Sequence, residues 1–263
     1  MRFDDPLVVR ELLRKHQLPD EEPVRATKEG IVHATWFCGD SVVRILKEPE
    51  ELPDVLTEAD AAPAAWKAGI RTPKVIVHDL QADPPYSILE RAPGKTLSTT
   101  NYLPDPDEFF FDLGREIRRI HEEVTEVPTR YLDEAWIVMP EDVASHGQEY
   151  AELVAKLDWQ PHSIPVLAHQ DLHADNILVH EGRLTAILDW GDAGYGDPAA
   201  DFRYLPARHL PAAFEGYGAD PALRHRAILH QLDQHFEAQE RRISYGPFGD
   251  SSREDLVNLI NAA

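Results

Sequence analysis

The sequence predicts an α+β fold, with short antiparallel strands in the first part of the chain and helices in most of the rest. Runs rich in β-branched residues, separated by turn signals, occupy residues 30–46 and 74–90. Beyond residue 105, apolar side chains recur at the three- and four-residue spacing of a buried helix face. The chain has 263 residues, 43% of them hydrophobic, so it is long enough to bury a large core.

The chain is strongly acidic, with 47 acidic residues, 26 basic residues and a formal net charge of −21. Nucleic acids and anionic membranes are bound by clustered lysines and arginines, and the sequence contains no dense basic run. We therefore expect neither partner. The charge favours a cationic ligand only weakly, because a solvated or salt-adapted surface accounts for it equally well.

Two features concern the cellular compartment. Cys38 is the only cysteine, so no intrachain disulfide can form. The first residues carry Asp4 and Asp5 where a signal peptide has a basic region, and no run reaches the ~18 apolar residues of a membrane span. These features predict a cytoplasmic protein.

The first expected elements are a helix and a hairpin. Asp5 and Pro6 are typical of a helix start, and Leu7, Leu12 and Leu13 are expected on its buried side. Residues 30–46 then read as two strands joined by a turn at residues 38–40. The hairpin lacks the glycine-rich pattern G-x-G-x-x-G. We therefore interpret His33, near its start, as an ordinary strand residue.

A helix is expected over residues 54–69, ended by Gly69. Pro63 lies inside it; because a proline there removes one hydrogen bond and costs ~3 kcal/mol, we expect a kink or a restart. Two more strands are expected at residues 74–79 and 86–90. The following segment, residues 91–94, breaks regular structure and is the candidate linker between two parts of the chain.

Helices dominate the remainder. Asp105 caps a long helix whose buried stripe carries Phe109, Leu113, Ile117 and Ile120. His121 near its end is explained by the helix dipole. A second helix is expected over residues 142–157. Further helices begin at Asp220–Pro221 and at Ser251–Glu254.

The most informative stretch is residues 169–176, with the pattern H-x-D-x-x-x-x-N, followed by D-W-G that begins thirteen residues after Asn176. A phosphoryl-transfer site needs one carboxylate that accepts the proton of an attacking hydroxyl, and a carboxylate and an amide oxygen that hold Mg²⁺ on the nucleotide phosphates. The pattern therefore assigns Asp171 as catalytic base and Asn176 and Asp189 as Mg²⁺ ligands.

The residues between the two motifs support this assignment. Two β-rich runs, residues 177–179 and 184–188, are separated by a Glu181-Gly182 turn. The strands are of similar length, so the turn should return Asp189 to a position beside Asn176.

These residues allow a resemblance to be named. HQDLHADN, DWG and the G-D-P-x-x-D segment at residues 196–201 resemble the aminoglycoside phosphotransferase family, the small-molecule branch of the protein-kinase-like fold. The resemblance implies a bilobal fold. Residues 1–91 would form a small N-terminal antiparallel-sheet lobe that covers the nucleotide, and residues 92–263 a larger, mostly helical lobe for catalysis and acceptor binding. No A-P-E sequence follows Asp189, so no protein substrate is expected.

The resemblance also implies a cation on the second hairpin strand that grips the nucleotide phosphates. Arg44 and Lys47 are the candidates, and strand alternation points them to opposite faces. We favour Arg44, which shares a face with Val42, where a purine ring could rest. Lys47 lies at the end of the strand. Glu58 on the next helix is the expected partner of the cation.

Further roles follow from the resemblance. Backbone groups of Glu90 and Ala92 would meet the purine edge of the nucleotide. The residues expected to shape the catalytic loop are His169, Asp197 and Asp201, and the candidate substrate contacts are Asp192, Glu149 and Glu152.

One alternative belongs to another class of enzyme. His169, Asp171, His173 and Asp175 alternate with period two, so in an extended segment all four would face one side. Such a cluster could bind zinc or a di-metal centre for hydrolysis. This reading leaves Asn176 and the D-W-G carboxylate without a role.

The function we expect is transfer of the γ-phosphoryl group of ATP or GTP, with Mg²⁺, to a hydroxyl of a small molecule. The resemblance favours an antibiotic acceptor, an aminoglycoside first, and hence a role in antibiotic resistance. A macrolide, or a metabolite such as choline or homoserine, is the alternative acceptor, because the fold does not fix the substrate.

Overall fold

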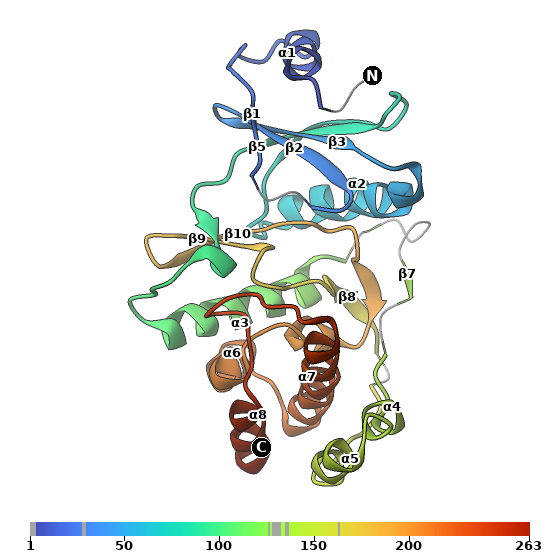
Figure 1. Ribbon diagram of the computed structural model, residues 1–263, viewed down its shortest axis with the longest axis vertical. Coiled ribbons are helices and arrows are strands. Elements are labelled where there is room, and N and C mark those ends of the chain that lie inside the picture. The colour runs from blue at the N-terminus through green and yellow to red at the C-terminus, as the bar shows by residue number, and fades with distance from the viewer. Residues whose placement is uncertain (1–3, 28–29, 126, 128–132, 135–136, 163) are drawn as a thin grey trace.

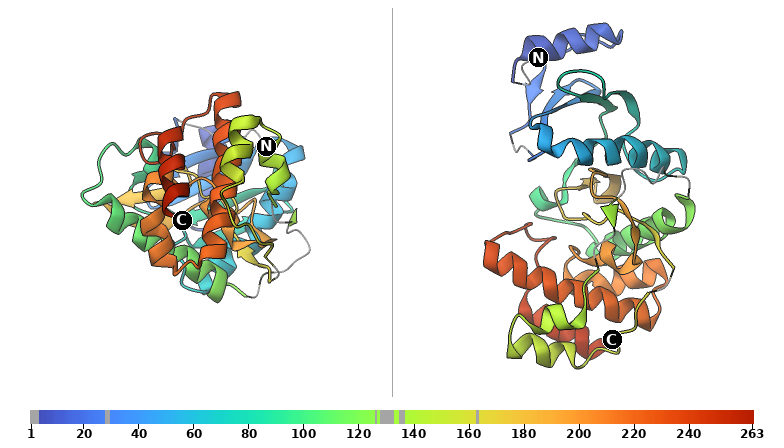
Figure 2. Two further views of the ribbon diagram at one scale, coloured as in Figure 1. Left: turned by 90° about the horizontal axis from the view of Figure 1, so that it is seen from below. Right: turned by 90° about the vertical axis from the view of Figure 1, so that its right-hand side faces the viewer.

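The computed structural model describes residues 4–27, 30–125, 127, 133–134, 137–162 and 164–263. A sheet with the first two helices forms the upper end of the molecule, and a larger, mostly helical part forms the lower end (Figure 1). In the side view of Figure 2 the two chain ends lie at opposite ends of the molecule. The predicted α+β class and the two-part arrangement are confirmed.

The upper sheet is antiparallel throughout, with strand order β1-β2-β3-β5-β4. The predicted hairpin and both later strands are present. The strands are β1 (Val24–Arg25), β2 (His33–Cys38), β3 (Ser41–Leu46), β4 (Val75–Asp79) and β5 (Tyr86–Glu90).

Helix α1 (Pro6–Lys15) covers the outer face of this sheet (Figure 1). Asp5 caps it by accepting a hydrogen bond from Leu7 N at 2.9 Å, and Val9, Leu12 and Leu13 pack with β2, β3 and β5 in an upper core. The expected burial of Leu7 is wrong, because its side chain is 65% exposed. Leu7 precedes Val9 by two positions, about 200° around a helix, so it faces away from the sheet.

Helix α2 (Leu52–Lys67) follows a short 3₁₀ segment, η1 (Pro49–Glu51), and lies beneath the sheet (Figure 1). It runs through Pro63 as one helix, so of the two expected outcomes, a kink or a restart, the restart does not occur. Alanines, which are good helix formers, surround the proline. Ala61, Ala62 and Ala65 are buried in the lower core, and that packing holds the helix together.

After Glu90 the chain leaves the upper sheet, and β6 (Lys95–Thr96) joins a second antiparallel sheet of order β10-β9-β6. Strand β9 spans Ile177–His180 and β10 spans Arg183–Ile187. Gly94 has φ +110°, and a Cβ there would lie 2.4 Å from Val179 O, so only glycine fits. This crossing segment contains residues 91 and 92, and we propose residues 1–91 and 92–263 as the two lobes.

Helix α3 (Pro106–Glu123) runs through the lower part, and its predicted cap and apolar stripe are confirmed. It packs closely on α6 (Leu210–Tyr217), because a Cβ on Gly114 would lie 2.0 Å from Ala213 O. The remaining helical elements are η2 (Leu97–Thr99), η3 (Pro198–Phe202), η4 (Ala207–His209), α7 (Pro221–Arg241) and α8 (Arg253–Ala262).

The single helix predicted over residues 142–157 is wrong. Two shorter helices occupy this region, α4 (Pro140–Ala144) and α5 (Gln148–Val154), at the lower end of the molecule in Figure 1. Gly147 separates them with φ +136°, a conformation that ends a helix and that glycine adopts readily.

A third sheet has the order β7-β11-β8, with β7 (Asp133–Glu134), β8 (Val166–Ala168) and β11 (Gly194–Gly196). Strand β11 pairs parallel with β7 and antiparallel with β8. Among the helices in the described parts of the chain, none has the length and apolar character needed to cross a membrane.

Candidate active site

The catalytic loop, residues 169–176, begins where β8 ends and leads into β9. Asn176 is buried, and its Nδ2 donates to Asp171 at the backbone O (2.9 Å) and at Oδ2 (2.8 Å). Nε2 of His173 lies 3.3 Å from the same Oδ2. These contacts fix the carboxylate of Asp171. They also turn the amide nitrogen of Asn176 toward the base, so its amide oxygen is the atom left for a metal ion.

The hairpin of β9 and β10 returns the chain to this loop. Leu188 N donates to Asn176 O at 2.8 Å, so Asp189 follows directly after a residue that is bonded to Asn176. Asp189 has φ +61°, which is uncommon for a residue other than glycine, and its side chain is 40% exposed. The three motif residues Asp171, Asn176 and Asp189 therefore meet in one place.

Arg44 reaches the same place from β3. Its guanidinium is largely buried; Nη1 contacts Glu58 Oε1, and Nη2 donates to Asp189 Oδ1 at 3.1 Å. Lys47 lies just beyond β3, and its Nζ donates to Gly30 O at 2.5 Å. The structure thus brings Arg44, and not Lys47, beside the predicted metal ligand.

The charges of this group are interdependent. Burial raises the pKa of Glu58 to about 7, against the opposing effect of Arg44. Burial also disfavours the charged form of Arg44, but Glu58 and Asp189 hold its pKa above the ordinary value. The carboxylate of Asp189 is partly desolvated, which opposes its ionisation, yet Arg44 keeps its pKa below the usual value. Arg44 therefore stays cationic, as a phosphate-binding group must.

His33 has a role that the sequence does not reveal. It is only 4% exposed, and its Nδ1 accepts a hydrogen bond from Arg44 Nη2 at 2.8 Å. Because Nδ1 accepts, the ring proton sits on Nε2 and the imidazole is neutral. Burial keeps the pKa of His33 well below its ordinary value. The hairpin register pairs His33 with Leu46 and Thr35 with Arg44, so His33 and Arg44 are diagonal neighbours on one face of the sheet. This register is the signal that could have found the contact.

His169 and Asp201 both contact the backbone of the catalytic loop, in keeping with the loop-shaping role expected for them. Nε2 of His169 donates to Leu188 O at 2.9 Å. The buried carboxylate of Asp201 accepts from His169 N at 3.0 Å and from Gln170 N at 2.7 Å. Behind it, Nε2 of His121 lies 2.9 Å from Asp201 Oδ2. The helix dipole alone therefore does not explain His121.

Asp197 makes different contacts from those expected. Its Oδ1 accepts from Ala199 N at 2.9 Å and caps η3, and its Oδ2 accepts from Arg226 Nε of α7 at 2.7 Å. The carboxylate thus joins η3 to α7. Asp197 stands at the start of η3. Asp201 lies further along η3 and reaches the backbone of the catalytic loop.

The linker presents backbone groups toward the upper sheet. Glu90 N donates to Lys74 O at 2.9 Å, and Arg91 N donates to Asp40 O at 2.8 Å. Among the described residues, Ala92 N has no such carbonyl partner, so it is the linker N–H that could meet a purine edge. Val42 lies on the Arg44 face of β3 and pairs with Leu89 of β5.

Of the three candidate substrate contacts, Asp192 lies near the catalytic loop, whereas Glu149 and Glu152 lie on α5. Asp192 is exposed just after the D-W-G motif, and its backbone O accepts from Gln170 Nε2 at 2.8 Å. Glu149 of α5 contacts Arg253 at the start of α8, and Glu152 accepts from Gln148 at 2.9 Å. Figure 1 places α5 far below the loop.

The structure does not support the metallohydrolase alternative. It required residues 169–176 to be extended, but they form a loop in which His169 binds Leu188 O. Nδ1 of His173 accepts from Asp175 N at 3.1 Å. Within the described ranges, no group of three or more His, Cys, Asp or Glu side chains is placed to hold a metal ion.

A cavity of about 280 Å³ is lined by α7 and by residues from the segments 203–205 and 242–251. Its wall includes Tyr204 and Tyr245, whose rings have centroids 6.0 Å and 4.9 Å from that of His173. His173 in turn contacts Asp171. Sequence reasoning missed both tyrosines, because no motif marks them and they reach the loop from more than thirty residues beyond Asp171.

Comparisons with known proteins agree with this geometry. Residues 24–240 match the model of the phosphotransferase enzyme family. Viomycin phosphotransferase of Streptomyces vinaceus is 27% identical over 235 residues, 76% of this chain and 78% of that protein.

Two solved structures share the fold, which confirms the protein-kinase-like architecture. The streptomycin–ATP–APH(2″)-IIa complex has a TM-score of 0.66 at 16% identity, covering 92% of this chain and 91% of that chain. Spectinomycin phosphotransferase, APH(9)-Ia, with ADP and spectinomycin, has a TM-score of 0.66 at 15% identity, covering 99% and 95%. Because the family model spans most of the chain, this protein belongs to the phosphotransferase enzyme family.

Proposed function

We propose that this protein transfers the γ-phosphoryl group of ATP or GTP to a hydroxyl of an antibiotic-like small molecule, with an aminoglycoside favoured. One observation carries the proposal: Asp171, Asn176 and Asp189 meet in one place, and Arg44 donates to Asp189 there. We also propose that the reaction takes place in the cytoplasm, where ATP and GTP are plentiful.

The donor set fits Mg²⁺. Carboxylate and amide oxygens are the hard ligands that this ion prefers, and the amide nitrogen of Asn176 is already committed to Asp171. We assign the amide oxygen of Asn176 and the carboxylate of Asp189 as ligands. When bound, Mg²⁺ would neutralise charge on the nucleotide phosphates.

The chain's own residues would perform the other parts of the reaction. Asp171 would accept the proton of the acceptor hydroxyl and orient its oxygen for in-line attack. Arg44, held by Glu58 and His33, would contact the α- and β-phosphates, and the N–H of Ala92 would meet the purine edge. Most of the acceleration would come from positioning and charge neutralisation.

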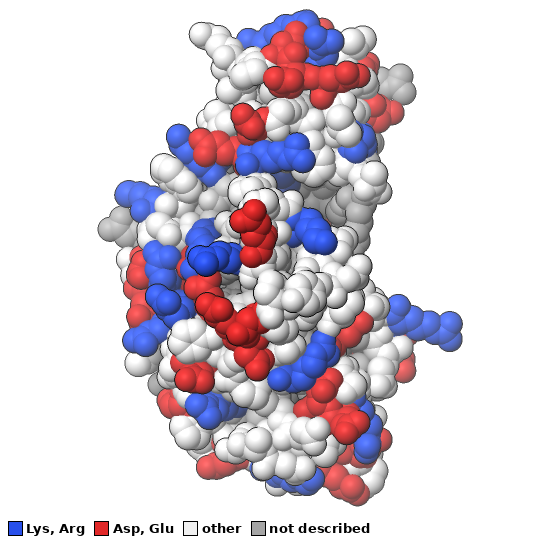
Figure 3. Space-filling view, turned by 90° about the vertical axis from the view of Figure 1, so that its left-hand side faces the viewer, with Lys and Arg blue, Asp and Glu red and all other residues white. Residues whose placement is uncertain are grey.

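The choice of acceptor rests on the relatives and on the cavity. Viomycin phosphotransferase is a relative, and streptomycin and spectinomycin are bound in two structures of the same fold. Charge supports a cationic acceptor only weakly, because acidic and basic side chains are interspersed over the face shown in Figure 3. Arg203 also lines the cavity. It is buried, and its Nη2 lies 2.8 Å from Glu237 Oε2.

A specific observation favours a second candidate, an uncharged acceptor such as a macrolide. The cavity has in its wall the rings of Tyr204 and Tyr245, which contact His173, the partner of Asp171. Aromatic faces pack well against uncharged sugar or lactone rings.

The test is a nucleotide-consumption assay over a panel of hydroxylated antibiotics and metabolites, with ATP and GTP in parallel and Mg²⁺ present. We expect turnover with viomycin or with at least one aminoglycoside or macrolide antibiotic, and none in the Asp171→Asn variant. Turnover confined to choline-like or homoserine-like metabolites would reject the antibiotic acceptor. Equal turnover by the Asp171→Asn variant would reject the assigned base.

A further inference from the structure

The backbone conformation of Asp189 needs support from its surroundings. A residue other than glycine with φ near +60° costs roughly 1–2 kcal/mol relative to ordinary conformations, and Asp189 has φ +61°. Its partly exposed side chain is held by one contact, from Arg44, and the backbone before it is held by the hydrogen bonds of Leu188. On the other side of Asp189, the buried residue that follows it holds the chain.

That neighbour is Trp190, among the largest fully buried side chains of the molecule. The centroids of its ring and the ring of His169 are 4.7 Å apart, and the two ring planes are inclined at 60°. The indole N–H can only donate, and a buried donor needs an acceptor. Here Nε1 donates to Thr72 Oγ1 at 3.0 Å, a hydrogen bond between residues 118 positions apart.

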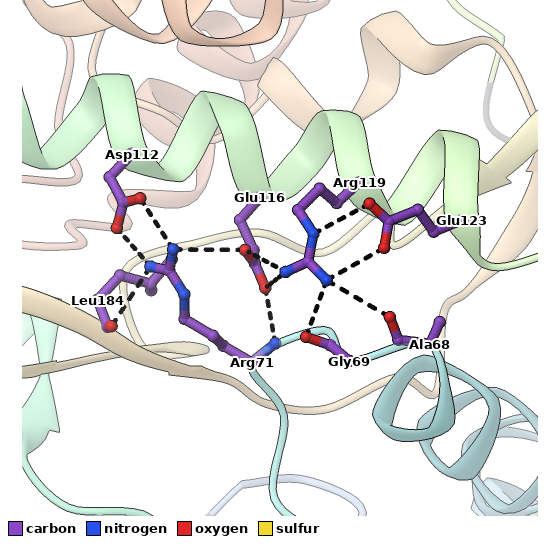
Figure 4. A network of polar contacts seen from close by, with 8 residues as sticks. All are labelled: Ala68, Gly69, Arg71, Asp112, Glu116, Arg119, Glu123 and Leu184. Atoms are coloured by element: carbon purple, nitrogen blue, oxygen red, sulfur yellow. Dashed lines mark hydrogen bonds and ion pairs between the residues drawn. The ribbon is translucent and has the colours of Figure 1, made fainter.

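Thr72 is a fixed acceptor because the segment before it is anchored to α3 and β10. Figure 4 shows this network. Glu116 of α3 is fully buried and accepts from Arg71 N at 2.6 Å and from Arg119 Nη1 at 3.1 Å. Arg119 Nη2 donates to Gly69 O at 3.0 Å.

The side chain and carbonyl of Arg71 complete the anchor. The guanidinium donates through Nη2 to Asp112 Oδ1 at 2.8 Å (Figure 4). The carbonyl accepts from Ile187 N of β10 at 2.7 Å, two residues before Asp189. The segment that carries Thr72 is thus bound to the same strand that delivers the metal ligand.

We propose that Thr72 is a positioning residue for Asp189, acting through its hydrogen bond to Trp190. The inference rests on the proposed Mg²⁺-binding role of Asp189. The hydroxyl of Thr72 holds the indole, the indole fixes the backbone of the D-W-G segment, and the carboxylate of Asp189 is thereby held beside Asn176.

The test compares three variants. Thr72→Val keeps the shape but removes the acceptor, and Thr72→Ser keeps the hydroxyl. Thr100→Val is the matched control, because Thr100 is also buried and its hydroxyl donates to Thr96 O at 3.0 Å, a contact within its own segment. Two readouts are used: amide hydrogen exchange of residues 187–192 in the metal-free protein, and the Mg²⁺ dependence of binding of a non-hydrolysable ATP analogue.

We expect Thr72→Val to accelerate amide hydrogen exchange in residues 187–192. It should also raise the Mg²⁺ concentration needed for half-maximal binding of the ATP analogue about tenfold. Thr72→Ser should stay within about twofold of wild type, and Thr100→Val should change neither readout. In a Trp190→Phe background, which lacks the indole N–H, Thr72→Val should add little, as expected for two residues that act as one unit.

The inference would be overturned if Thr72→Val matched wild type in both readouts, or if Thr72→Ser lost as much as Thr72→Val. A wild-type protein that bound nucleotide without regard to Mg²⁺ would instead reject the proposed function, and this inference with it. The wild-type titration therefore separates the two failures.

Discussion

The catalytic loop and the Arg44 cluster, which comprises Arg44, Glu58 and His33, meet at Asp189 but are built differently. The contacts of the loop lie mostly within residues 166–201, where backbone amides supply many of the donors. The cluster draws one side chain each from β2, β3 and α2. One region is assembled locally and the other by the packing of separate elements.

The Arg44 cluster also joins the two cores of the molecule. Val43 and Ile45, the neighbours of Arg44 on β3, belong to the upper core. Ala61 and Ala62 of α2, close to Glu58, belong to the lower core. The ion pair therefore spans the boundary between the cores. Its loss should affect stability and nucleotide binding together, whereas changes at the loop should act mainly on turnover.

The largest expected effect is at the point where the two regions meet. Asp189→Ala removes a proposed metal ligand and one acceptor of Arg44. We expect turnover to fall at least about 1,000-fold, with little loss of stability because the side chain is partly exposed. Steady-state kinetics and thermal unfolding measure the two effects. A kcat near that of wild type would contradict the metal assignment.

Glu58→Gln tests the cluster alone. Glu58 is only 2% exposed and burial raises its pKa to about 7, so Glu58→Gln weakens one contact of Arg44 while Asp189 stays as its charged partner. Impairing a buried hydrogen bond of this kind costs about 1–3 kcal/mol. We expect this loss in urea unfolding and a higher KM for nucleotide. The control is Glu122→Gln, which breaks the exposed Arg118–Glu122 pair and should cost less than about 1 kcal/mol. Equal losses in the two variants would show that the cluster does not bridge the cores.

Asp201→Asn tests the loop alone. The amide cannot accept from both His169 N and Gln170 N, which costs about 1–3 kcal/mol. Displacement of Asp171 should lower kcat by up to about 100-fold, with KM for nucleotide unchanged. A rise in that KM with an unchanged kcat would show that the two regions are not separable.

The same variant has a pH signature. Burial disfavours the charged form of Asp201, but the hydrogen bond to His121 and its other partners hold its pKa below the usual value. A depressed carboxyl pKa contributes stability that is complete above the unfolded value of about 4 and is lost as pH falls through the folded value. Unfolding between pH 5 and about 2 should therefore be less pH-dependent in Asp201→Asn than in wild type. An unchanged slope would contradict the buried ionised state.

The smallest effect is expected at His33. His33→Leu removes the Nδ1 acceptor of Arg44 and should raise KM for nucleotide about fivefold, whereas His33→Gln keeps an acceptor and should recover most of the loss. His78→Leu is the control, because His78 is a partly buried histidine of the same sheet whose Nδ1 contacts Ser87. An equal effect in both histidine variants would assign His33 to packing alone.

The comparison of the two regions also explains what could be read from the sequence. The loop and hairpin were predictable because turn chemistry and motif spacing fix Asp171, Asn176 and Asp189 within one short stretch. Strand alternation showed that Arg44 and Lys47 cannot share a face, and the position of Lys47 at the end of the strand favoured Arg44. The contact of Thr72 was not predictable, because it depends on packing against Trp190, 118 positions away. The contact of His33 with Arg44 needed the exact register of the hairpin, which the sequence pattern alone does not fix.

Two errors have local physical causes. The helix expected over residues 142–157 was divided by Gly147, whose effect periodicity alone does not capture. The restart expected at Pro63 did not occur, because the burial of neighbouring alanines outweighs one lost hydrogen bond. Asp197 and Asp201 share a motif, and only the structure distinguishes their partners.

The most direct test of the central claim is single-turnover phosphoryl transfer by Asp171→Asn, with an acceptor identified in the panel and saturating Mg²⁺ and nucleotide. We predict that the rate of transfer falls by at least about 100-fold, as expected for loss of a general base, while the Kd for the nucleotide stays at the wild-type value. A rate close to that of wild type would show that the site formed by Asp171, Asn176 and Asp189 is not the centre of phosphoryl transfer.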